Sequence, residues 1–454
     1  MIAINPLAER GFTNFVAPKD ILHTTLGKGH AVAHAVYRVN IGGDLALFKG
    51  VAKRLLEMQQ AGHEVLDRAF IEAHCSGFDA WREDLAKESW APIVEKSGIP
   101  RAQIDEIAAL YTRSNATMAT WCMGITHHED AVATIQTIVN LLLLKGNIGK
   151  PGAGAVPVRG HSNVQGDRTM GCTYKVSDAW LDNMTNAFPG VRLSRAVGLD
   201  AVGVVDGLLE RSIDAFLSLG GNFAIAAPDA PRVCAALAQS KLTVHIATKL
   251  NRTHCYPGEI GLLLPCLART DVDTRGGQMQ TVSLEDSMSM VHGSRGIQAP
   301  RSPLMMSEPA IVAGIGNALC GSTAVAWAAL ADDYALIREK IEQCQRNVVD
   351  GFEQQNRKLA QPGGFHLSNA AAQRIWKTPS GKAKFKPHPI PCHGPVERAR
   401  LQAGAHASEL RPERILTLMT IRSHDQFNTT VYGLDDRYRG VFGGRQVIFL
   451  TPST

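Results

Sequence analysis

Hydrophobic residues recur along the chain at two spacings, one typical of buried strands and one typical of amphipathic helices. Residues 1–5 (MIAIN) predict a short strand. Residues 42–60 predict a helix because their hydrophobic positions, Leu45, Phe48, Val51, Leu55 and Met58, follow helical spacing. Residues 117–126 (TMATWCMGIT) predict a buried strand that ends at Gly124, followed by a helix from Glu129 to Leu144.

The clearest alternation of strand and helix lies in the middle of the chain. Residues 214–223 (DAFLSLGGNF) predict a strand that ends in Gly220 and Gly221. A helix is expected over 227–240 (APDAPRVCAALAQS), and a second strand over 242–248 (LTVHIAT). This order is that of a βαβ unit, the element of an open parallel sheet, so the predicted fold class is α/β.

Three loops of this arrangement are candidates for one ligand site, because ligands of open parallel sheets bind where the strands end. They are residues 123–128 (MGITHH), 220–223 (GGNF) and 248–254 (TKLNRTH). Glycine lets backbone N–H groups approach a phosphate, and Asn222, Thr248 and Lys249 could contact the rest of a nucleotide. The alternative is that all three are ordinary turns, since the sequence holds neither a Walker motif nor GxGxxG.

Residues 158–171 (VRGHSNVQGDRTMG) form the most polar stretch, with glycines, arginines, carboxamides, a histidine and an aspartate close together. Two interpretations fit this composition. One is a solvated surface loop, and the other is the wall of a polar ligand site.

Composition places the chain among ordinary globular proteins and excludes several other classes. At 454 residues it predicts two or three domains, and 45% hydrophobic with 20% charged residues argues against disorder. A net charge of +5 is too low to indicate nucleic-acid binding but suits an anionic cofactor. The longest aliphatic run, 138–144, is too short to cross a bilayer.

The cysteines and the first residues point to a reducing compartment. Nine cysteines without any CxxC argue against a disulfide framework and against a locally built zinc or iron–sulfur site. The first twelve residues lack the pattern of a signal peptide, so a cytoplasmic location without membrane association is expected. Residues 387–412 read as a linker, and 414–420 (RILTLMT) and 445–450 (RQVIFL) predict strands of a further, β-rich unit.

The motifs now support a resemblance to a known family. Residues 141–171 (LLLLKGNIGKPGAGAVPVRGHSNVQGDRTMG) closely resemble a stretch of the molybdopterin-dependent oxidoreductases of the dimethyl sulfoxide reductase superfamily, in particular formate dehydrogenase-like alpha subunits. The likeness continues through NPLAERG, IGGDLALFKG, WCMGITHH, LGGNF, TKLNRTH, LLLPCLART, EDSMSMVH and RSHDQFNTTVYGLDDRYRG. It therefore extends across almost the whole chain in conserved order and spacing.

The resemblance implies an architecture and a cofactor. Residues 1–160 would complete one Rossmann-like α/β domain, 161–400 would supply a second with a linker at its end, and 411–454 would open a β-barrel dinucleotide-binding domain. The cofactor would be molybdenum held by two molybdopterin guanine dinucleotides. The family's 4Fe–4S cysteines and the cysteine or selenocysteine that binds molybdenum lie upstream of the matched region, so the chain is expected to be a middle piece of a longer enzyme.

The resemblance also implies site residues. Arg159 takes the place of the arginine that orients formate at the metal, a role that suits a planar, permanently charged fork. The implied cofactor contacts are Asn5, Gly43, Asp44, Met123, Gly124, His127, Gly160, Asn163, Gln165, Gly166, Gly221, Asn222, Asp229, Thr248, Lys249, Arg422 and His424. No residue of this chain is expected to bind the metal directly.

Two hypotheses follow from the sequence. The first is an oxidoreductase in which a small substrate such as formate gives two electrons to molybdenum. An electron-transfer partner subunit then receives these electrons. His161 and Ser162, where formate dehydrogenases have Gln-Asn, and His127, where glutamine is common, change the substrate pocket. The alternative is a non-catalytic truncated remnant that binds a nucleotide or a partner subunit.

Overall fold

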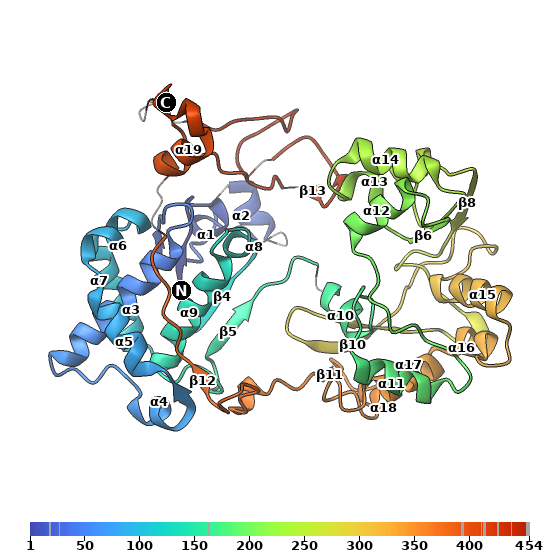
Figure 1. The fold of residues 1–454 in the computed structure, drawn as a ribbon, viewed down its shortest axis with the longest axis horizontal. Coiled ribbons are helices and arrows are strands. Elements are labelled where there is room, and N and C mark those ends of the chain that lie inside the picture. The colour runs from blue at the N-terminus through green and yellow to red at the C-terminus, as the bar shows by residue number, and fades with distance from the viewer. Residues whose placement is uncertain are drawn as a thin grey trace. The chain divides into compact units, whose positions relative to one another are not determined.

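The fold was analysed in a computed structural model, which describes residues 1–17, 20–26, 28–161, 163–391, 395–409, 411, 415–424, 426–436 and 438–450. The chain forms two compact units (Figure 1). Unit 1 comprises Met1–Gly160, Asn369–Asp425 and Gly433–Thr454, and unit 2 comprises His161–Ser368 and Gln426–Tyr432. The mixed α/β class expected from the sequence is confirmed.

The elements of unit 1 are β1 (Ile2–Ile4), α1 (Arg10–Thr13), α2 (Ile21–Leu26), β2 (Ala35–Tyr37), α3 (Asp44–Gln60), α4 (Arg68–His74), β3 (Cys75–Ser76), α5 (Phe78–Lys87), α6 (Trp90–Ser97), α7 (Arg101–Arg113), β4 (Met118–Trp121), α8 (Met123–Thr126), α9 (Ala131–Leu144), β5 (Gly154–Pro157), η3 (Ala371–Gln373), β12 (Ala383–Lys384), α19 (Pro395–Ala403) and η4 (Gly404–Glu409). Those of unit 2 are α10 (Val164–Thr169), α11 (Asp178–Ala187), α12 (Ala201–Leu209), β6 (Ala215–Leu219), α13 (Phe223–Ala226), α14 (Ala230–Gln239), β7 (Leu242–Ala247), η1 (Arg252–Cys255), β8 (Ile260–Pro265), η2 (Arg275–Gly277), β9 (Val282–Glu285), β10 (Met290–Ser294), α15 (Glu308–Cys320), α16 (Trp327–Asp332), α17 (Tyr334–Gln345), α18 (Gln355–Leu359), β11 (Phe365–His366), β13 (Gln426–Phe427) and β14 (Thr430–Val431).

Helix α3 is the centre of the unit 1 core. Leu47, Val51 and Leu55 have no exposed surface, and the helix packs against α6, α7 and α9. Each fully buried aliphatic side chain of this kind contributes about 1.5–3 kcal/mol to folding. The helix predicted over residues 42–60 is therefore confirmed. Its hydrophobic residues are buried because other helices contact α3 on several sides.

Three two-stranded parallel sheets belong to unit 1, one of them the pair β3 and β12. Strand β1 pairs with β2, and β4 pairs with β5 in a register that aligns Trp121 with Pro157. Strand β4 ends at Trp121, and Met123–Thr126 then forms the short helix α8, so the prediction that the strand continues to Gly124 is wrong. The pairing with β5 ends at Trp121, so the next residues have no partner strand to hold them extended.

Unit 2 contains the expected βαβ unit. Strands β6, β7 and β8 pair in parallel, with β7 in the middle, and α14 connects β6 to β7. Helices α12 and α14 cover one face of this sheet, where Phe216 packs with Val233, Ala236 and Leu237. The central strand is buried along most of its length, since it has a partner strand on each side and helices over one face.

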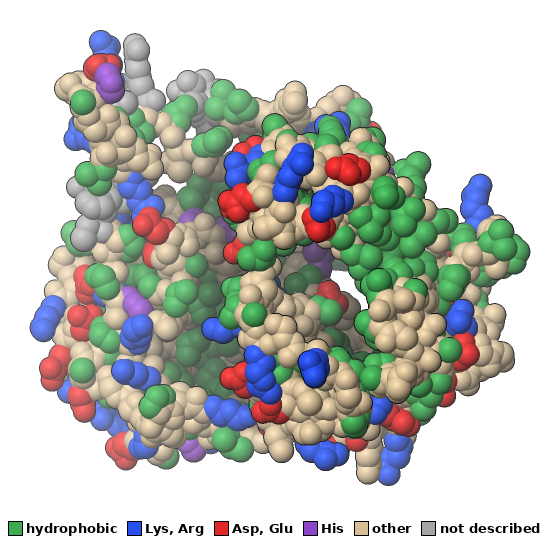
Figure 2. Space-filling model, turned by 45° about the vertical axis from the view of Figure 1, so that its right-hand side comes forward, with side chains coloured by type: hydrophobic (Ala, Val, Ile, Leu, Met, Phe, Trp, Pro, Cys, Tyr) green, Lys and Arg blue, Asp and Glu red, His purple; other side chains and the backbone are tan. Residues whose placement is uncertain are grey.

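The second face of this sheet is covered at one end only. Ile246 and Leu264 pack there against Ile311 of α15. On the same face Leu217 and Ile260 remain 52% and 60% exposed. Figure 2 shows hydrophobic side chains gathered on the surface of unit 2.

The last described residues differ from the sequence prediction. Residues 415–420 and 445–450 form no strand in the described part of the chain, so the strands expected there are wrong. Leu418 and Ile448 are 80% and 77% exposed, and neither segment has a neighbouring strand to satisfy its backbone. The antiparallel pair β13 and β14 lies between them. Among the described helices, none combines the length and the apolar character needed to span a bilayer.

Candidate functional site

The loops after β4 and β5 lie at one edge of a parallel sheet in unit 1. Because the two strands run in the same direction, the segments that follow Trp121 and Pro157 emerge together. A Cβ placed on Gly160 would lie 3.4 Å from Sδ of Met123, so the two loops touch. Three predicted residues, Arg159, Gly160 and Met123, are thereby brought together. Arg159 is half-buried there.

The same loop after β4 reaches the start of helix α3. Gly124 and His127 are exposed on it, and the backbone N–H of His127 donates to the Met123 carbonyl at 3.1 Å. A Cβ on Gly42 would lie 3.8 Å from Nδ1 of the next residue, His128. The predicted residue Asp44 therefore lies in the same neighbourhood as the predicted loop 123–128.

Asp44 is a buried carboxyl group in an unusual electrostatic setting. It is 9% exposed and occupies the first turn of α3. Burial raises the pKa of Asp44 to about 6, while His128 acts in the opposite direction and the Asp130 carboxylate raises the pKa further. Oδ2 of Asp130 is itself buried without a hydrogen-bond partner among the described residues. His128 is the last residue of the MGITHH loop and Asp130 lies two residues beyond it, but neither was predicted as a site residue from the sequence.

Two predicted residues of unit 1 serve the protein's own packing. The Asn5 side chain donates to the Leu7 carbonyl at 2.7 Å and shapes the turn after β1. Gly43 lies against the end of α6, where a Cβ would come within 2.6 Å of the Lys96 carbonyl oxygen. Glycine is required at position 43 by this close approach, whatever else the residue contacts.

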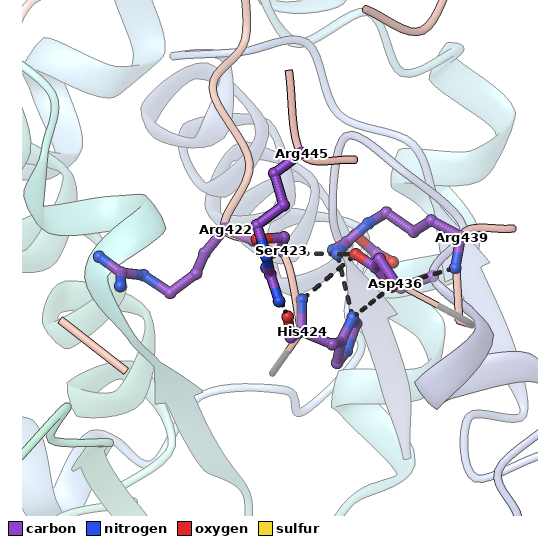
Figure 3. Close-up of polar contacts among 7 residues, drawn as sticks. Arg422, Ser423, His424, Asp436, Arg439 and Arg445 are labelled. Carbon is purple, nitrogen blue, oxygen red and sulfur yellow. Dashed lines mark hydrogen bonds and ion pairs between the residues drawn. The ribbon is translucent and has the colours of Figure 1, made fainter. Parts of the chain in front are cut away.

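A polar network holds the segment that carries Arg422 and His424 (Figure 3). His424 Nδ1 lies 2.9 Å from Oδ1 of Asp436, and Nη1 of Arg439 donates to Oδ2 of the same carboxylate at 3.0 Å. Arg439 also pairs with Glu9 through Nη2 at 2.7 Å. The segment is thus tied to the first residues of unit 1 by charge-assisted hydrogen bonds.

Arginine side chains also fix the backbone of this segment. Nη1 of Arg439 donates to the Arg422 carbonyl at 3.0 Å, and Nη1 of Arg445 donates to the His424 carbonyl at 2.8 Å. Arg445 contacts the Ser423 hydroxyl as well. In Figure 3 the Arg422 side chain points away from Asp436, so Arg422 joins the network through its backbone carbonyl.

Asp436 carries the opposite electrostatic shift from Asp44. Its side chain is 5% exposed, and burial alone would raise its pKa. Hydrogen bonds from Arg439 and His424 outweigh burial and lower the pKa of Asp436 to about 2. The carboxylate is therefore ionised at neutral pH and holds two cationic or hydrogen-bonding partners in place.

In unit 2 the carboxyl end of β6 collects several polar groups. Gly220 and Gly221 have φ of +67° and +79°, and a Cβ at either would meet nothing within 4 Å. Asn222 instead bonds within the protein: its Oδ1 accepts from the Thr253 hydroxyl at 3.0 Å, and its Nδ2 donates to Oγ1 of Thr429 at 3.2 Å. Asn222 thereby joins the end of β6 to η1 and to the β13–β14 turn.

The carboxyl end of β7 adds the other predicted contacts. Thr248 and Lys249 are exposed directly after the strand. Asp229 is the N-terminal cap of α14, with a left-handed φ of 59° and a 3.4 Å hydrogen bond from the Arg232 backbone N–H. Gly221, Asn222, Thr248 and Lys249 all follow neighbouring parallel strands. Of the three loops named from the sequence, 220–223 and 248–254 lie in unit 2 and 123–128 lies in unit 1. That they form one ligand site stays a prediction.

His245 on β7 lies under this edge and was not anticipated. It is 4% exposed, and neither ring nitrogen has a hydrogen-bond partner among the described residues. Its ring centroid lies 5.0 Å from that of His254. Burial and the neighbouring His254 lower the pKa of His245, so its imidazole is neutral at pH 7. A histidine inside a predicted strand of the βαβ unit is a signal by which His245 could have been singled out from the sequence.

Within the polar stretch 158–171, Val164–Thr169 forms helix α10 in unit 2. Oδ1 of Asn163 accepts from the Glu285 backbone N–H at 3.0 Å, and its Nδ2 donates to Asp167 at 3.2 Å. Gly166 is buried, and a Cβ there would come within 2.3 Å of Asn163 Oδ1. Both residues therefore join α10 to β9, whereas Gln165 is exposed. His161 packs edge-on against Phe427, with centroids 4.5 Å apart.

The sequence is similar to those of known proteins over nearly its whole length. Over 456 aligned residues, 99% of this chain, the sequence is 44% identical to protein YdeP of Escherichia coli (strain K12). It is 43% identical over its whole length to an uncharacterized oxidoreductase of Mycobacterium tuberculosis (strain ATCC 25618 / H37Rv). The chain spans 58% and 56% of the lengths of these relatives. No family model matches the chain.

The solved structures give the fold. Acetylene hydratase from Pelobacter acetylenicus superposes on 78% of this chain and 49% of its own with a TM-score of 0.51 at 15% sequence identity. The fold is similar to that of acetylene hydratase. This similarity covers most of the chain.

In unit 2 open glycines follow β6 and an exposed lysine follows β7. In unit 1 Arg422, Arg439 and Arg445 lie around His424, and Arg159 lies on the loop after β5. Backbone N–H groups at glycines and guanidinium forks are the donors that phosphates and carboxylates accept. The residues that sequence reasoning missed, His128, Asp130, Asp436, Arg439 and Arg445, all lie beside residues that it found.

Replacing Asp44 by asparagine tests its buried carboxyl group. The folded pKa of about 6 lies above the unfolded value of about 3.9, so the wild-type protein loses stability as pH rises through this interval. The stability of Asp44→Asn relative to the wild type should therefore increase between pH 4 and pH 7, measured as the free energy of unfolding in urea. Asp79→Asn, at a side chain that is 77% exposed, is the control and should show no such trend.

Replacing Asp436 by asparagine tests the network of Figure 3. Its folded pKa of about 2 lies below the unfolded value, so its stabilisation is present above about pH 4 and is lost as pH falls toward 2. Asp436→Asn should lower the free energy of unfolding by about 1–3 kcal/mol at pH 7, with a smaller difference at pH 3. Asp435→Asn, which keeps an acceptor for the Gly443 N–H, should change little. Equal stability of the Asp436 variant and the wild type at pH 7 would contradict the role assigned to Asp436.

Proposed function

We propose that this chain forms the molybdopterin-binding part of an oxidoreductase similar to formate dehydrogenase alpha subunits. The observation that carries the proposal is the placement of Arg159, Gly160 and Met123 at the shared edge of β4 and β5. Parallel sheets bind ligands at this edge, and an arginine there can orient a carboxylate through two parallel hydrogen bonds. Similarity to an oxidoreductase along the whole chain supports the same class of reaction.

The residues of unit 2 fit the nucleotide ends of such a cofactor. A molybdopterin guanine dinucleotide carries a pyrophosphate, which requires close approach by donors and positive charge. Gly220 and Gly221 leave open space beside their backbone, and Lys249 and Thr248 are exposed at the next strand. Asp229 offers an exposed carboxylate that could accept hydrogen bonds from a guanine edge. Asn222, which is hydrogen-bonded to Thr253 and Thr429, would hold the loop after β6 in place beside the guanine.

In unit 1 the residues that would contact the cofactor or lie beside it are Arg422, His424 and Asp44. Arg422 and His424 are held by Asp436 and Arg439 and would contact phosphate or pterin. Asp44 and His128 offer a proton acceptor and donor pair beside the loop that carries Met123 and His127. When bound, molybdenum supplies a two-electron redox centre. This chain's own part is to bind the nucleotides, to orient the substrate through Arg159 and to provide the electrostatic surroundings.

The substrate in this proposal is formate or a similar small anion. Arg159 offers a permanently charged planar fork, which matches a carboxylate better than an ammonium group would. An iron–sulfur cluster, in the complete protein, and an electron-transfer partner subunit would accept the electrons. A cytoplasmic location goes with this proposal.

Cofactor content tests the binding half of the proposal. Protein purified from a host that makes the molybdenum cofactor should contain molybdenum by mass spectrometry and release guanine nucleotide on acid treatment. Lys249→Ala should lower both contents because its charge faces the phosphate. Lys241→Ala is a matched control at the opposite end of β7, where Lys241 pairs only with exposed Asp214. A folded protein that retains guanine nucleotide but no molybdenum would favour a non-catalytic nucleotide-binding role.

Substitution of Arg159 tests the substrate half. Arg159→Ala should lower kcat/KM for formate about 100-fold or more while molybdenum content stays unchanged, measured with an artificial electron acceptor. Arg159→Lys keeps the charge but loses the fork and should recover only part of the activity. Arg113→Ala, at the exposed end of α7, is the control. Unchanged turnover in Arg159→Ala would contradict the role, and no formate oxidation by molybdenum-loaded wild type would contradict the substrate.

A further inference from the structure

Three side chains with metal-binding atoms gather near the start of unit 1. They are Asp20, His23 and His30, and one ligand atom from each lies within 4.8 Å of the others. Among the described residues, no other group of three or more His, Cys, Asp or Glu side chains meets this distance. None of the three was implied by the family resemblance.

Asp20 and His23 are held together by the start of helix α2. Oδ1 of Asp20 accepts the His23 backbone N–H at 3.0 Å, as an N-terminal capping residue does. Its Oδ2 lies 2.7 Å from Nδ1 of His23. Their spacing in sequence therefore places a carboxylate and an imidazole side by side on the first turn.

His30 reaches this pair from a different segment. Its backbone is fixed to Phe15, since His30 N donates to the Phe15 carbonyl at 2.8 Å and Phe15 N donates back at 2.9 Å. The preceding Gly29 is required for this approach, because a Cβ there would lie 2.5 Å from the Phe15 oxygen. The His30 ring then lies 4.8 Å from the His23 ring, tilted by 52°.

We propose that Asp20, His23 and His30 bind a divalent cation of the zinc class. Two imidazoles and one carboxylate are the donor set that Zn²⁺ accepts, with a fourth position for water. Ligand atoms on one tetrahedral zinc are about 3.4 Å apart, given bonds of about 2.0–2.1 Å. The three donors already lie within 4.8 Å of one another, so side-chain rotations bring them to this separation.

Metal binding would replace the present Asp20–His23 contact. Their 2.7 Å hydrogen bond is shorter than the separation of two ligands on zinc, so the proton between them must leave when the ion binds. The ion would then join α2 to the Phe15–His30 bridge and close the loop between residues 20 and 30. The expected consequence is a more rigid segment between α1 and β2, independent of any molybdenum cofactor.

Zinc titration of the purified chain tests the proposal. After treatment with a chelator, the wild-type protein should bind one Zn²⁺ in competition with a chromophoric chelator, and Mg²⁺ should not compete. Asp20→Asn, His23→Ala and His30→Gln should each weaken binding by at least about tenfold. His406→Ala is the matched control, because His406 forms a similar i,i+3 pair with Glu409 at 3.1 Å but has no third ligand among the described residues. Its affinity for zinc should equal that of the wild type.

A second measurement does not depend on the variants. Co²⁺ bound to the wild-type protein should show the visible d–d absorption of a four- or five-coordinate ion, and X-ray absorption of the zinc form should show two imidazole ligands. Circular dichroism reports whether each variant is folded. No zinc binding by wild type, an octahedral all-oxygen site, or folded ligand variants that bind as the wild type does would each overturn the proposal.

Discussion

Strands that run parallel to one another release the following segments at the same edge of their sheet, and this constraint places the loops after β4 and β5 in unit 1 and those after β6 and β7 in unit 2. In unit 1 it brings the residues after Trp121 beside those after Pro157. In unit 2 it aligns the loop after β6 with the loop after β7. The connecting helices pack against the strands through hydrophobic side chains. The polar residues lie in the loops at the ends of the strands. The residues that stabilise the fold thus lie in the strands and helices, whereas the candidate ligand-binding residues lie in the loops after the strands.

Two aspartates show how the same side chain takes opposite roles in these surroundings. Asp44 is buried without a cation bonded to it, and its pKa rises to about 6. Asp436 is equally buried, but Arg439 and His424 donate to it and lower its pKa to about 2. The first group can exchange a proton near neutral pH, whereas the second is a fixed negative charge that organises the arginines around it. The segment near Asp436 thus depends on ion pairs where it lacks a hydrophobic core.

The glycines divide in a similar way. A side chain at Gly43 or Gly166 would collide with neighbouring atoms, so these residues are required by packing between elements. Gly220 and Gly221 need positive φ and leave open space beside them. The motif-rich stretches of the sequence therefore combine residues that pack between elements with residues that have open space beside them. Asn163 and Asn222 belong to the first kind, because their amides bond to other segments of unit 2.

The sequence by itself determined the elements whose spacing reflects burial: α3, α9 and the β6–α14–β7 unit follow directly from hydrophobic periodicity, which is a local property of the chain. It also indicated the glycine and polar residues at the ends of β6 and β7. Only the tertiary structure decided which polar groups meet, because Asp44 with His128, Arg439 with Glu9, and Asn222 with Thr429 are far apart in sequence. It likewise decided that residues 415–420 and 445–450 form no strand, since a strand requires a partner and periodicity cannot provide one.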